Sequence, residues 1–329
     1  MKISVIIPVY NASLTLKECL DSVFESNYKN FEVIVVSDFS SDNSIEIAKN
    51  YKCKIIELDE NKGPAFARNK GAEESQGDIL LFLDSDVIIN KNSLDLVSEK
   101  FSSKDVNAIQ GIYSHEPNYK YLATQFYQSY LCYYVWPEDK KYATTLVTAC
   151  FGIRKKIFME LKGFDTKMKK ATCEDEQFGY VLINKGYKIL ILRNLQVEHR
   201  VNYNTTKFIK RRFAQDFDRI KFYLREKTYT NKIKQTNYSK VIFGIPIIGL
   251  ILLTFIANIF FSNKMIVLIF LILNIFYILL HIGFLRFVSN TKGIKNVAGI
   301  LMMFYLDTFL MLMAVTFGSL NFFLSKEKY

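Results

Sequence analysis

The sequence lacks the features that mark secreted, zinc-binding or repetitive proteins. Its five cysteines are an odd number without a CxxC pair or a Cys/His spacing, which favours reduced cytosolic thiols over a disulfide framework or a zinc site. The apolar run at residues 3–9 is too short for a signal peptide and leads directly into a turn. No internal repeat and no motif that reads a nucleic-acid groove is present. We therefore expect a soluble part that stays in the cytoplasm and does not bind nucleic acid.

Charge and hydropathy are distributed unevenly along the 329 residues. Residues 1–199 contain 25 basic and 27 acidic side chains, whereas residues 200–240 contain twelve basic and three acidic ones, or +9 of the total net charge of +11. Residues 241–329 are dominated by Ile, Leu, Phe and Met. A basic belt before apolar segments is attracted to an anionic membrane surface by ~1 kcal/mol per Lys or Arg. The sequence thus predicts a soluble domain over 1–204, an interfacial segment over 205–240 and a membrane region over 241–329.

Three apolar stretches, at about 241–261, 265–287 and 297–323, each reach the ~20 residues that a helix needs to cross a bilayer. Arg286, Lys292 and Lys295 lie between the second and third stretches, while Lys264 alone lies between the first two. Basic loops stay inside, so three spans should leave the soluble domain in the cytoplasm and the C-terminus outside. His281 and Asp307 lie within these stretches and should face the interior of the bundle, in roles that the sequence does not assign.

An amphipathic helix is expected just before the first apolar stretch. Its apolar positions are separated by five, four, three and four residues, with Lys and Arg between them: Phe208, Phe213, Phe217, Ile220 and Leu224. This pattern predicts a helix that lies in the membrane interface. The alternative is a helix that packs on the soluble domain.

The N-terminal region reads as an α/β domain. Apolar runs at residues 3–9, 31–36, 55–58 and 78–83 alternate with stretches of helical spacing, which predicts a parallel sheet covered on both faces. Ligands of such sheets bind beyond the carboxyl ends of the strands. The polar residues at those ends are Tyr10, Asp38 and the segment Asp84 to Asp86.

Asp84 and Asp86 follow a strand of five apolar residues, so both carboxylates should emerge together at the edge of the sheet. Hard oxygen ligands with free coordination positions suit Mg²⁺ or Mn²⁺ bridging two phosphates. An Asp-x-Asp pair alone is weak evidence, because solvated acids and helix caps give the same pattern.

Four segments that follow one another along the chain make the assignment of this site more specific. They are SVIIPVYN at residues 4–11, VIVVSD at 33–38, NKGPAFARN at 61–69 and GDILLFLDSD at 77–86, followed by Gly163-Phe164-Asp165 and Glu174-Asp175. In order and spacing, residues 3 to about 200 resemble the family 2 glycosyltransferases, which have the Rossmann-like GT-A fold. The resemblance implies a domain that binds a nucleotide sugar.

The resemblance also implies roles for individual residues. Pro8, Tyr10 and Asp38 would contact the nucleotide, and Arg68 would reach it unless it forms a surface salt bridge. Asp84 and Ser85 would lie near the ribose or the metal. Asp86 would bind the metal, with Asp84 and with His199 unless that histidine only packs or forms hydrogen bonds. Phe39 departs from the family pattern, because it occupies the position of a turn glycine.

Asp175 is the general base by resemblance. A neutral sugar hydroxyl is a poor nucleophile until a carboxylate within hydrogen-bond reach accepts its proton. The alternative for the neighbouring acids Glu174 and Glu176 is that they stabilise the start of a helix.

The expected activity is an inverting, metal-dependent transfer from a UDP-sugar or GDP-sugar to the hydroxyl of a lipid-linked saccharide at the cell membrane. A polyprenyl-phosphate acceptor is the alternative, but that group commonly has Gln where Ile88 stands here. A non-catalytic nucleotide-sugar-binding membrane protein is a third possibility. Synthases that extrude polymers usually carry a Gln-x-x-Arg-Trp segment, and this belt has no Trp.

Overall fold

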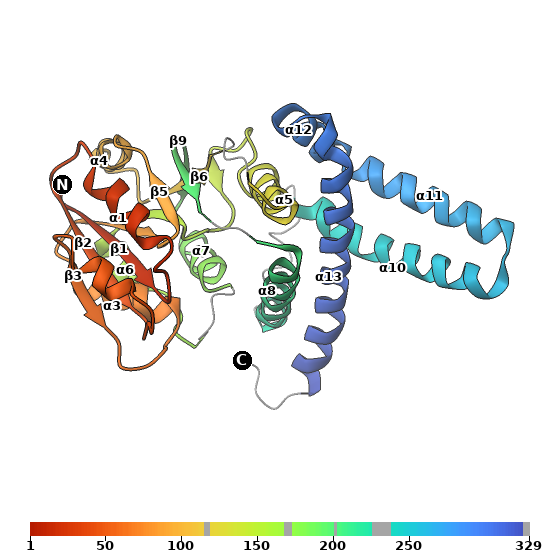
Figure 1. The fold of residues 1–329 in the computed structure, drawn as a ribbon, viewed down its shortest axis with the longest axis horizontal. Coiled ribbons are helices and arrows are strands. Elements are labelled where there is room, and N and C mark those ends of the chain that lie inside the picture. Colours follow the sequence, from red (N-terminus) through yellow and green to blue (C-terminus); the bar gives the residue numbers. More distant parts are fainter. Residues whose placement is uncertain (115–118, 168–172, 201–202, 226–237, 325–329) are drawn as a thin grey trace. The chain divides into compact units, whose positions relative to one another are not determined.

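The computed structural model describes residues 1–114, 119–167, 173–200, 203–225 and 238–324 (Figure 1). The chain forms two compact units. The sheet unit comprises Met1–Pro117 and Glu138–Val201, and the helical unit comprises Asn118–Pro137 and Asn202–Tyr329. Residues 118–137 lie within the predicted soluble domain 1–204 and group with the C-terminal helices.

The sheet unit is built on a mixed sheet in which the first strands pair in parallel. The strands of the described residues are β1 Ile3–Val9, β2 Phe31–Ser37, β3 Lys54–Glu57, β4 Ile79–Leu83, β5 Val87–Ile89, β6 Ala108–Tyr113, β7 Tyr142–Ala143, β8 Cys150–Arg154 and β9 Ile189–His199. Their order is β3-β2-β1-β4-β8-β6-β9-β5, with β7 paired to β9. The parallel pairing of β1, β2, β3 and β4 confirms the expectation from the apolar runs. Strands β5, β7 and β8 add antiparallel pairs.

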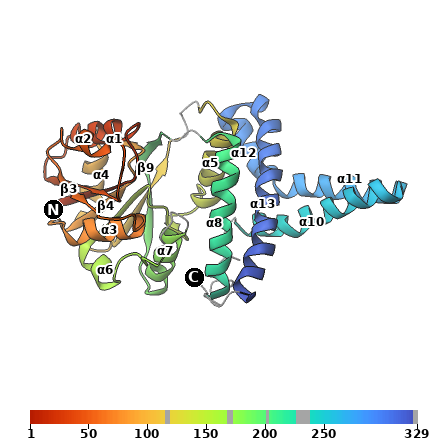
Figure 2. The ribbon, with the colours of Figure 1, turned by 60° about the horizontal axis from the view of Figure 1, so that its bottom comes forward.

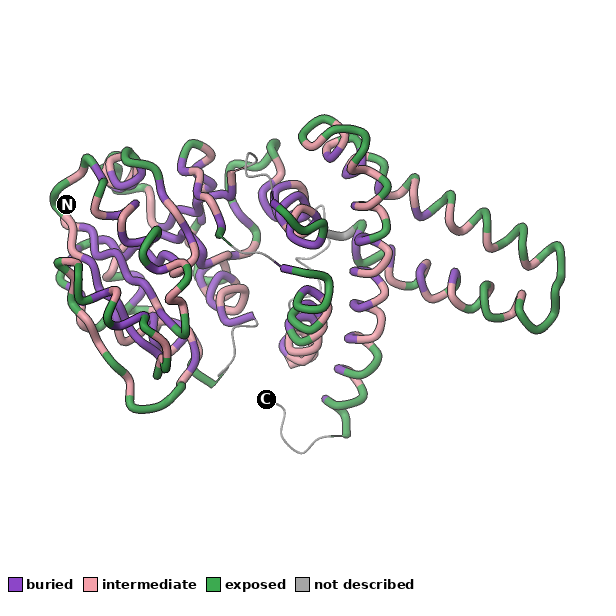
Figure 3. Tube along the Cα trace, in the orientation of Figure 1, coloured by how far each residue is buried: buried purple, intermediate pink, exposed green. Residues whose placement is uncertain are grey.

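Helices cover this sheet and bury its apolar strands, which form the core of the unit (Figure 3). They are α1 Leu16–Phe24, α2 Ser44–Ala48, α3 Pro64–Glu73, α4 Ser93–Ser102, α6 Lys155–Glu160 and α7 Glu174–Asn184. Helix α3 lies very close to β1, because a Cβ atom on Gly71 would come within 2.5 Å of Ile6 Cγ2. This approach packs the C-terminal half of α3 directly on the middle of β1.

The helical unit contains every predicted membrane segment. Its elements are α5 Leu122–Tyr130, the π-helix η1 Leu131–Val135, α8 Thr205–Arg225, α10 Tyr238–Phe261, α11 Lys264–Leu280, α12 Ile282–Lys292, the 3₁₀ turn η2 Ile294–Asn296 and α13 Val297–Leu324. Residues 226–237 of the predicted interfacial segment and linker lie outside the described residues.

The three predicted spans correspond to two helices and a bent pair. Among the described residues, Lys240–Phe261 and Ile294–Leu324 are long and apolar enough to cross a membrane. The middle stretch is instead Lys264–Leu280 and Ile282–Lys292, bent by 59°. The break falls at His281, which leaves helical geometry and lies 3.0 Å from the Tyr134 hydroxyl through its Nδ1 atom. Hydropathy alone did not predict this bend.

A helix, α8, is present where the amphipathic helix was predicted, and the face that it buries within the protein is largely polar. Its buried residues are Phe208, Arg212, Gln215, Asp216 and Phe222. The predicted apolar positions Phe213, Phe217, Ile220 and Leu224 are only half-buried. Polar residues face inward because Arg212 meets Asp307 of α13, with Nε to Oδ1 at 2.6 Å and Nη2 to Oδ2 at 3.1 Å. Asp307, which was predicted to face the interior of the bundle, is therefore buried, and Arg212 of α8 is its partner.

Candidate functional site

The loops after β1, β2 and β4 lie at one edge of the sheet because these strands run in parallel. Val9 lies opposite Ser37, and the Asp38 amide donates to the Val9 carbonyl at 2.8 Å. Tyr10 is 57% exposed at this edge, so its ring is accessible to a ligand. Pro8 is half-buried within β1. The expected convergence of the strand ends is therefore present.

Asp38 is a buried residue whose carboxylate holds the loop that precedes α3. Its carboxylate accepts hydrogen bonds from the backbone amides of Lys62 at 2.7 Å and Gly63 at 2.9 Å. The loop after it contains Phe39, whose φ of 61° lies in the left-handed region that a glycine would adopt without strain. A bulky residue thus adopts a conformation that favours glycine, at a cost in backbone energy.

Arg68 of α3 links two acids that are distant in sequence. Its Nη2 lies 2.8 Å from Asp84 Oδ1, and its Nη1 lies 3.0 Å from Glu174 Oε1. Arg68 and Glu174 are both buried. The first turn of α7 is thereby tied to the end of β4. Stabilising the helix start was the alternative role considered for Glu174. The pair with Arg68 was not predicted, because 106 residues separate its two members.

Asp86 and His199 meet because β5 and β9 pair in antiparallel register. Val87 lies opposite His199, which places His199 Nε2 3.4 Å from Asp86 Oδ2. The His199 ring is buried and stacks on Tyr113, with the ring centroids 4.7 Å apart. Ser85 is half-buried in the turn between these acids. Tyr113 was not identified from the sequence.

The donor chemistry at this edge suits a divalent cation with a partly open shell. Asp86 offers oxygen and His199 offers an imidazole nitrogen, a combination that Mn²⁺ accepts. Asp84 is less available, since Arg68 already contacts its Oδ1. Within the part of the chain that the structure describes, no group of three or more His, Cys, Asp or Glu residues is arranged to hold a metal. Two protein donors leave positions for water and phosphate oxygens, as is usual for Mg²⁺.

Asp175 is a carboxyl group with strongly altered acidity. It is half-buried at the start of α7, where its Oδ1 accepts from the Glu176 amide at 2.8 Å and its Oδ2 from the Thr148 amide at 3.4 Å. Burial, followed by the charges of Glu174 and Glu176, raises the pKa of Asp175 to about 8, although Arg68 opposes the shift. A carboxyl group that titrates close to neutral pH is well matched to proton transfer.

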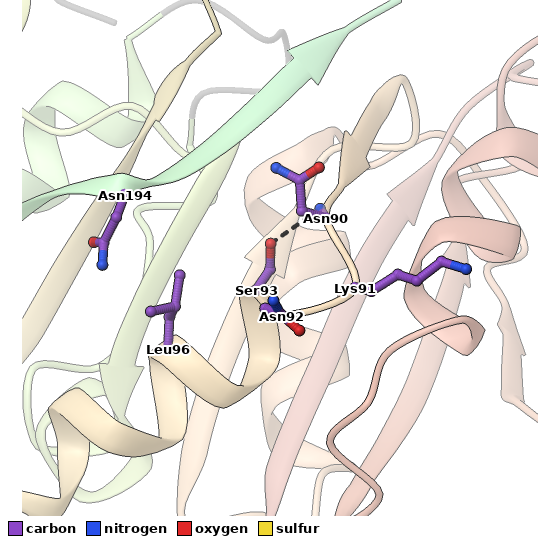
Figure 4. Close-up of a pocket in the computed structure, with 6 residues that line it drawn as sticks. All are labelled: Asn90, Lys91, Asn92, Ser93, Leu96 and Asn194. Carbon is purple, nitrogen blue, oxygen red and sulfur yellow. Dashed lines mark hydrogen bonds between the residues drawn. The ribbon is translucent and has the colours of Figure 1, made fainter.

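A separate pocket on the sheet unit lies beside the turn between β5 and α4 (Figure 4). It is lined by Asn90, Lys91, Asn92, Ser93, Leu96 and Asn194. Two of these residues are hydrogen-bonded, because the backbone N–H of Asn90 donates to Ser93 Oγ at 3.0 Å. None of the predicted site residues lines it, so it adds nothing to the candidate site.

Comparison with known proteins gives consistent matches to glycosyltransferases. Residues 4–162 match the model of the family described as glycosyl transferase family 2. A stretch of 98 residues is 43% identical to an uncharacterized glycosyltransferase of Haemophilus influenzae, covering 28% of this chain and 39% of that protein. A stretch of 116 residues is 31% identical to glycosyltransferase GlyG of Streptococcus pneumoniae, covering 34% and 38%. The chain thus spans less than two fifths of the length of these curated relatives.

One solved structure resembles the whole chain. It is the mannosyltransferase PcManGT from Pyrobaculum calidifontis in complex with GDP-Man and Mn²⁺, with a TM-score of 0.58, covering 99% of this chain and 88% of that chain. The sequence identity is 15%, so this likeness concerns the fold alone.

Proposed function

We propose that this chain, whose residues 4–162 match the model of glycosyl transferase family 2, moves a sugar from a UDP-sugar or GDP-sugar to the hydroxyl of a lipid-linked saccharide. Transfer proceeds with inversion at the anomeric carbon. The protein acts at the cell membrane with the sheet unit on the cytoplasmic side. The apolar helices of the helical unit and the basic belt before them support this location.

The donor binds at the carboxyl ends of β1, β2 and β4. The exposed ring of Tyr10 suits stacking on the nucleotide base, and the half-buried Pro8 lies two residues before it in β1. Asp38 acts chiefly by holding the loop that contains Lys62 and Gly63, since both amides already donate to its carboxylate. Arg68 fixes Asp84 rather than reaching freely toward the nucleotide.

The diphosphate is placed at the turn Asp84 to Asp86. Asp86 and His199 would hold Mn²⁺ or Mg²⁺, as their donor types and their 3.4 Å separation allow. Positive charge from a cation held there would neutralise the leaving diphosphate. The solved relative with GDP-Man and Mn²⁺ supports this assignment through its fold.

Asp175 accepts the proton of the acceptor hydroxyl. The hydroxyl oxygen then attacks the anomeric carbon while the bond from that carbon to the diphosphate oxygen breaks, and the nucleoside diphosphate leaves. The raised pKa of Asp175 is the observation that carries this proposal. A phosphate acceptor is already an anion and needs no such base, so Asp175 favours a hydroxyl acceptor.

Transfer of radiolabelled sugar by the purified full chain tests the proposal. Membrane lipid extract would serve as acceptor, and UDP-sugars and GDP-sugars would be supplied in turn with Mn²⁺. We expect Asp175→Asn and Asp86→Asn to lose transfer, while the exposed Asp59→Asn keeps it. Full transfer by Asp175→Asn would contradict the assignment of the base. Full transfer in the presence of EDTA would contradict the requirement for a divalent metal ion.

A further inference from the structure

Helices α8 and α13 of the helical unit run side by side. Arg212 of α8 pairs with Asp307 of α13, and eleven residues further along α13 a Cβ atom on Gly318 would lie 3.2 Å from the Phe217 carbonyl and 3.4 Å from Ile220. Residue numbers thus rise in the same direction along both helices. Figures 1 and 2 show the two helices adjacent in both views.

Helix α8 carries charge along its whole length. Lys207, Lys210 and Arg211 are exposed and lie within five residues of Arg212, whose partner Asp307 is close to the middle of α13. At 1.5 Å rise per residue, Lys210 and Arg211 stand within about 3 Å of that level along the axis. If α13 crossed a bilayer, these exposed cations would therefore lie near the middle of the hydrocarbon, which is the most costly depth for a charge.

The apolar hairpin formed by α10 and α11 behaves differently. Its base packs against the other helices of the unit, where Val241, Ile248 and Ile251 of α10 and Tyr277 of α11 are buried. Beyond this base its large apolar side chains are exposed, including Phe260 at 76%. The hairpin projects away from α13 rather than lying along it (Figures 1 and 2). Its base meets the middle of α13, where a Cβ atom on Gly244 would lie 3.6 Å from Thr308 Cγ2.

We propose that only the α10–α11 hairpin crosses the bilayer, and that α13 lies in the plane of an anionic membrane surface with α8 on its polar side. The exposed Met302, Phe317 and Phe323 of α13 face the lipid, while Asp307 and Gly318 face α8. The basic side chains of α8 complement anionic headgroups. This placement keeps every charge of α8 out of the hydrocarbon.

The dimensions of the hairpin agree with a full crossing. The 24 residues of α10 extend about 36 Å, and the 17 residues of α11 are within the range that spans a bilayer. Exposed Asn263 and Lys264 form its tip, where they need water on the far side. After the 59° bend, Arg286 of α12 is again exposed at the near surface. The two ends of the chain therefore lie on the same side of the membrane, in contrast to the three-span prediction.

The proposal can be tested independently of activity by measuring the membrane depth of nitroxide labels, each attached to a single introduced cysteine. The full chain would be reconstituted in phosphatidylcholine vesicles containing phosphatidylglycerol, with labels at Met302, Phe309, Phe317 or Phe323 of α13. Collisions with oxygen and with a nickel chelate report the depth. The unsubstituted protein, whose five cysteines are buried or half-buried, measures the background.

We expect all four positions of α13 to lie at a similar shallow depth of about 5–10 Å. Labels at Phe243, Leu253 and Phe260 of α10 provide the matched control in the same vesicles, and they should show a shallow, deep and shallow profile. A maximum of depth at Phe309 with shallow ends overturns the in-plane placement of α13. A flat profile along α10 overturns the crossing of the hairpin.

Epitope tags give a second measurement. Tags at the two termini and between Ser262 and Asn263 would be exposed to protease outside sealed vesicles. The proposal expects the terminal tags to be removed together and the hairpin tag to be protected. Protection of the C-terminal tag in vesicles that lose the N-terminal tag overturns it.

Discussion

Replacing Asp175 by Asn is expected to remove catalysis and to stabilise the folded protein at the same time. Loss of a general base commonly lowers the rate by about 10²- to 10⁴-fold. The gain in stability follows from the acidity of the wild-type group. Burial and the charges of Glu174 and Glu176 raise the pKa of Asp175 from 3.8 to about 8, so the folded chain disfavours the carboxylate.

The sign and the pH window follow from proton binding. The unfolded chain releases the Asp175 proton near pH 3.8, whereas the folded chain retains it up to about pH 8. This group therefore makes the wild type less stable as pH rises between those values. Asparagine has no proton to release. The advantage of Asp175→Asn should be small at pH 4, grow through the window and be complete above pH 8.

The size of the effect is set by the pKa shift and reduced by solvent. One pKa unit corresponds to about 1.4 kcal/mol, which gives an upper limit of about 6 kcal/mol for the full shift. Asp175 is only half-buried, so we expect about 2–4 kcal/mol at pH 8. For a unit of this size, that corresponds to a rise in Tm of about 5–10 °C.

Scanning fluorimetry of the detergent-solubilised protein at pH 5, 6, 7 and 8 would measure these shifts beside kcat/KM. Glu176→Gln is the matched control, because removing its charge should lower the pKa of Asp175. The pH at which kcat/KM levels off should then move down while activity is retained. A lower Tm for Asp175→Asn at pH 8, or a difference that does not vary with pH, would refute this reasoning.

Three further outcomes are expected. Arg68→Met leaves the buried Glu174 without its cation and should cost about 3–5 kcal/mol; an unchanged Tm would contradict the buried pair. Asp86→Asn should abolish the rise in Tm that Mn²⁺ gives the wild type, whereas the exposed Asp59→Asn should retain it; equal responses would show that the metal binds elsewhere. Phe39→Gly should raise the free energy of unfolding by about 1 kcal/mol, measured by denaturant titration, because its φ of 61° is unstrained in glycine; a loss of stability would instead indicate a packing role for the exposed ring.

Local sequence patterns were sufficient for the strands that carry the site. The apolar runs at 3–9 and 78–83 correspond to β1 Ile3–Val9 and β4 Ile79–Leu83. Parallel pairing then brings the residues after these strands to one edge, which follows from topology alone. The position of His199 beside Asp86 came from the family resemblance, since 113 residues separate them.

Contacts between distant segments were beyond the reach of local patterns. The ion pair of Arg68 with Glu174 and the stack of Tyr113 on His199 depend on packing that no periodicity encodes. The buried face of α8 shows the same limit. The spacing of its apolar residues did not indicate that Asp307 is buried and needs a cation, so that Arg212 turns inward.

The insertion of residues 118–137 into the sheet unit's sequence has a consequence for the order of synthesis. Phe126 and Tyr130 of α5 are buried in part by Phe304, which is made 178 residues after Phe126. At a synthesis rate of 5–20 residues per second, about 9–36 s therefore pass between the synthesis of α5 and that of Phe304, which helps to bury it. During that interval an aromatic segment is exposed within a growing chain. A truncation after residue 204 would make this exposure permanent, and a soluble version of the sheet unit must also remove residues 118–137.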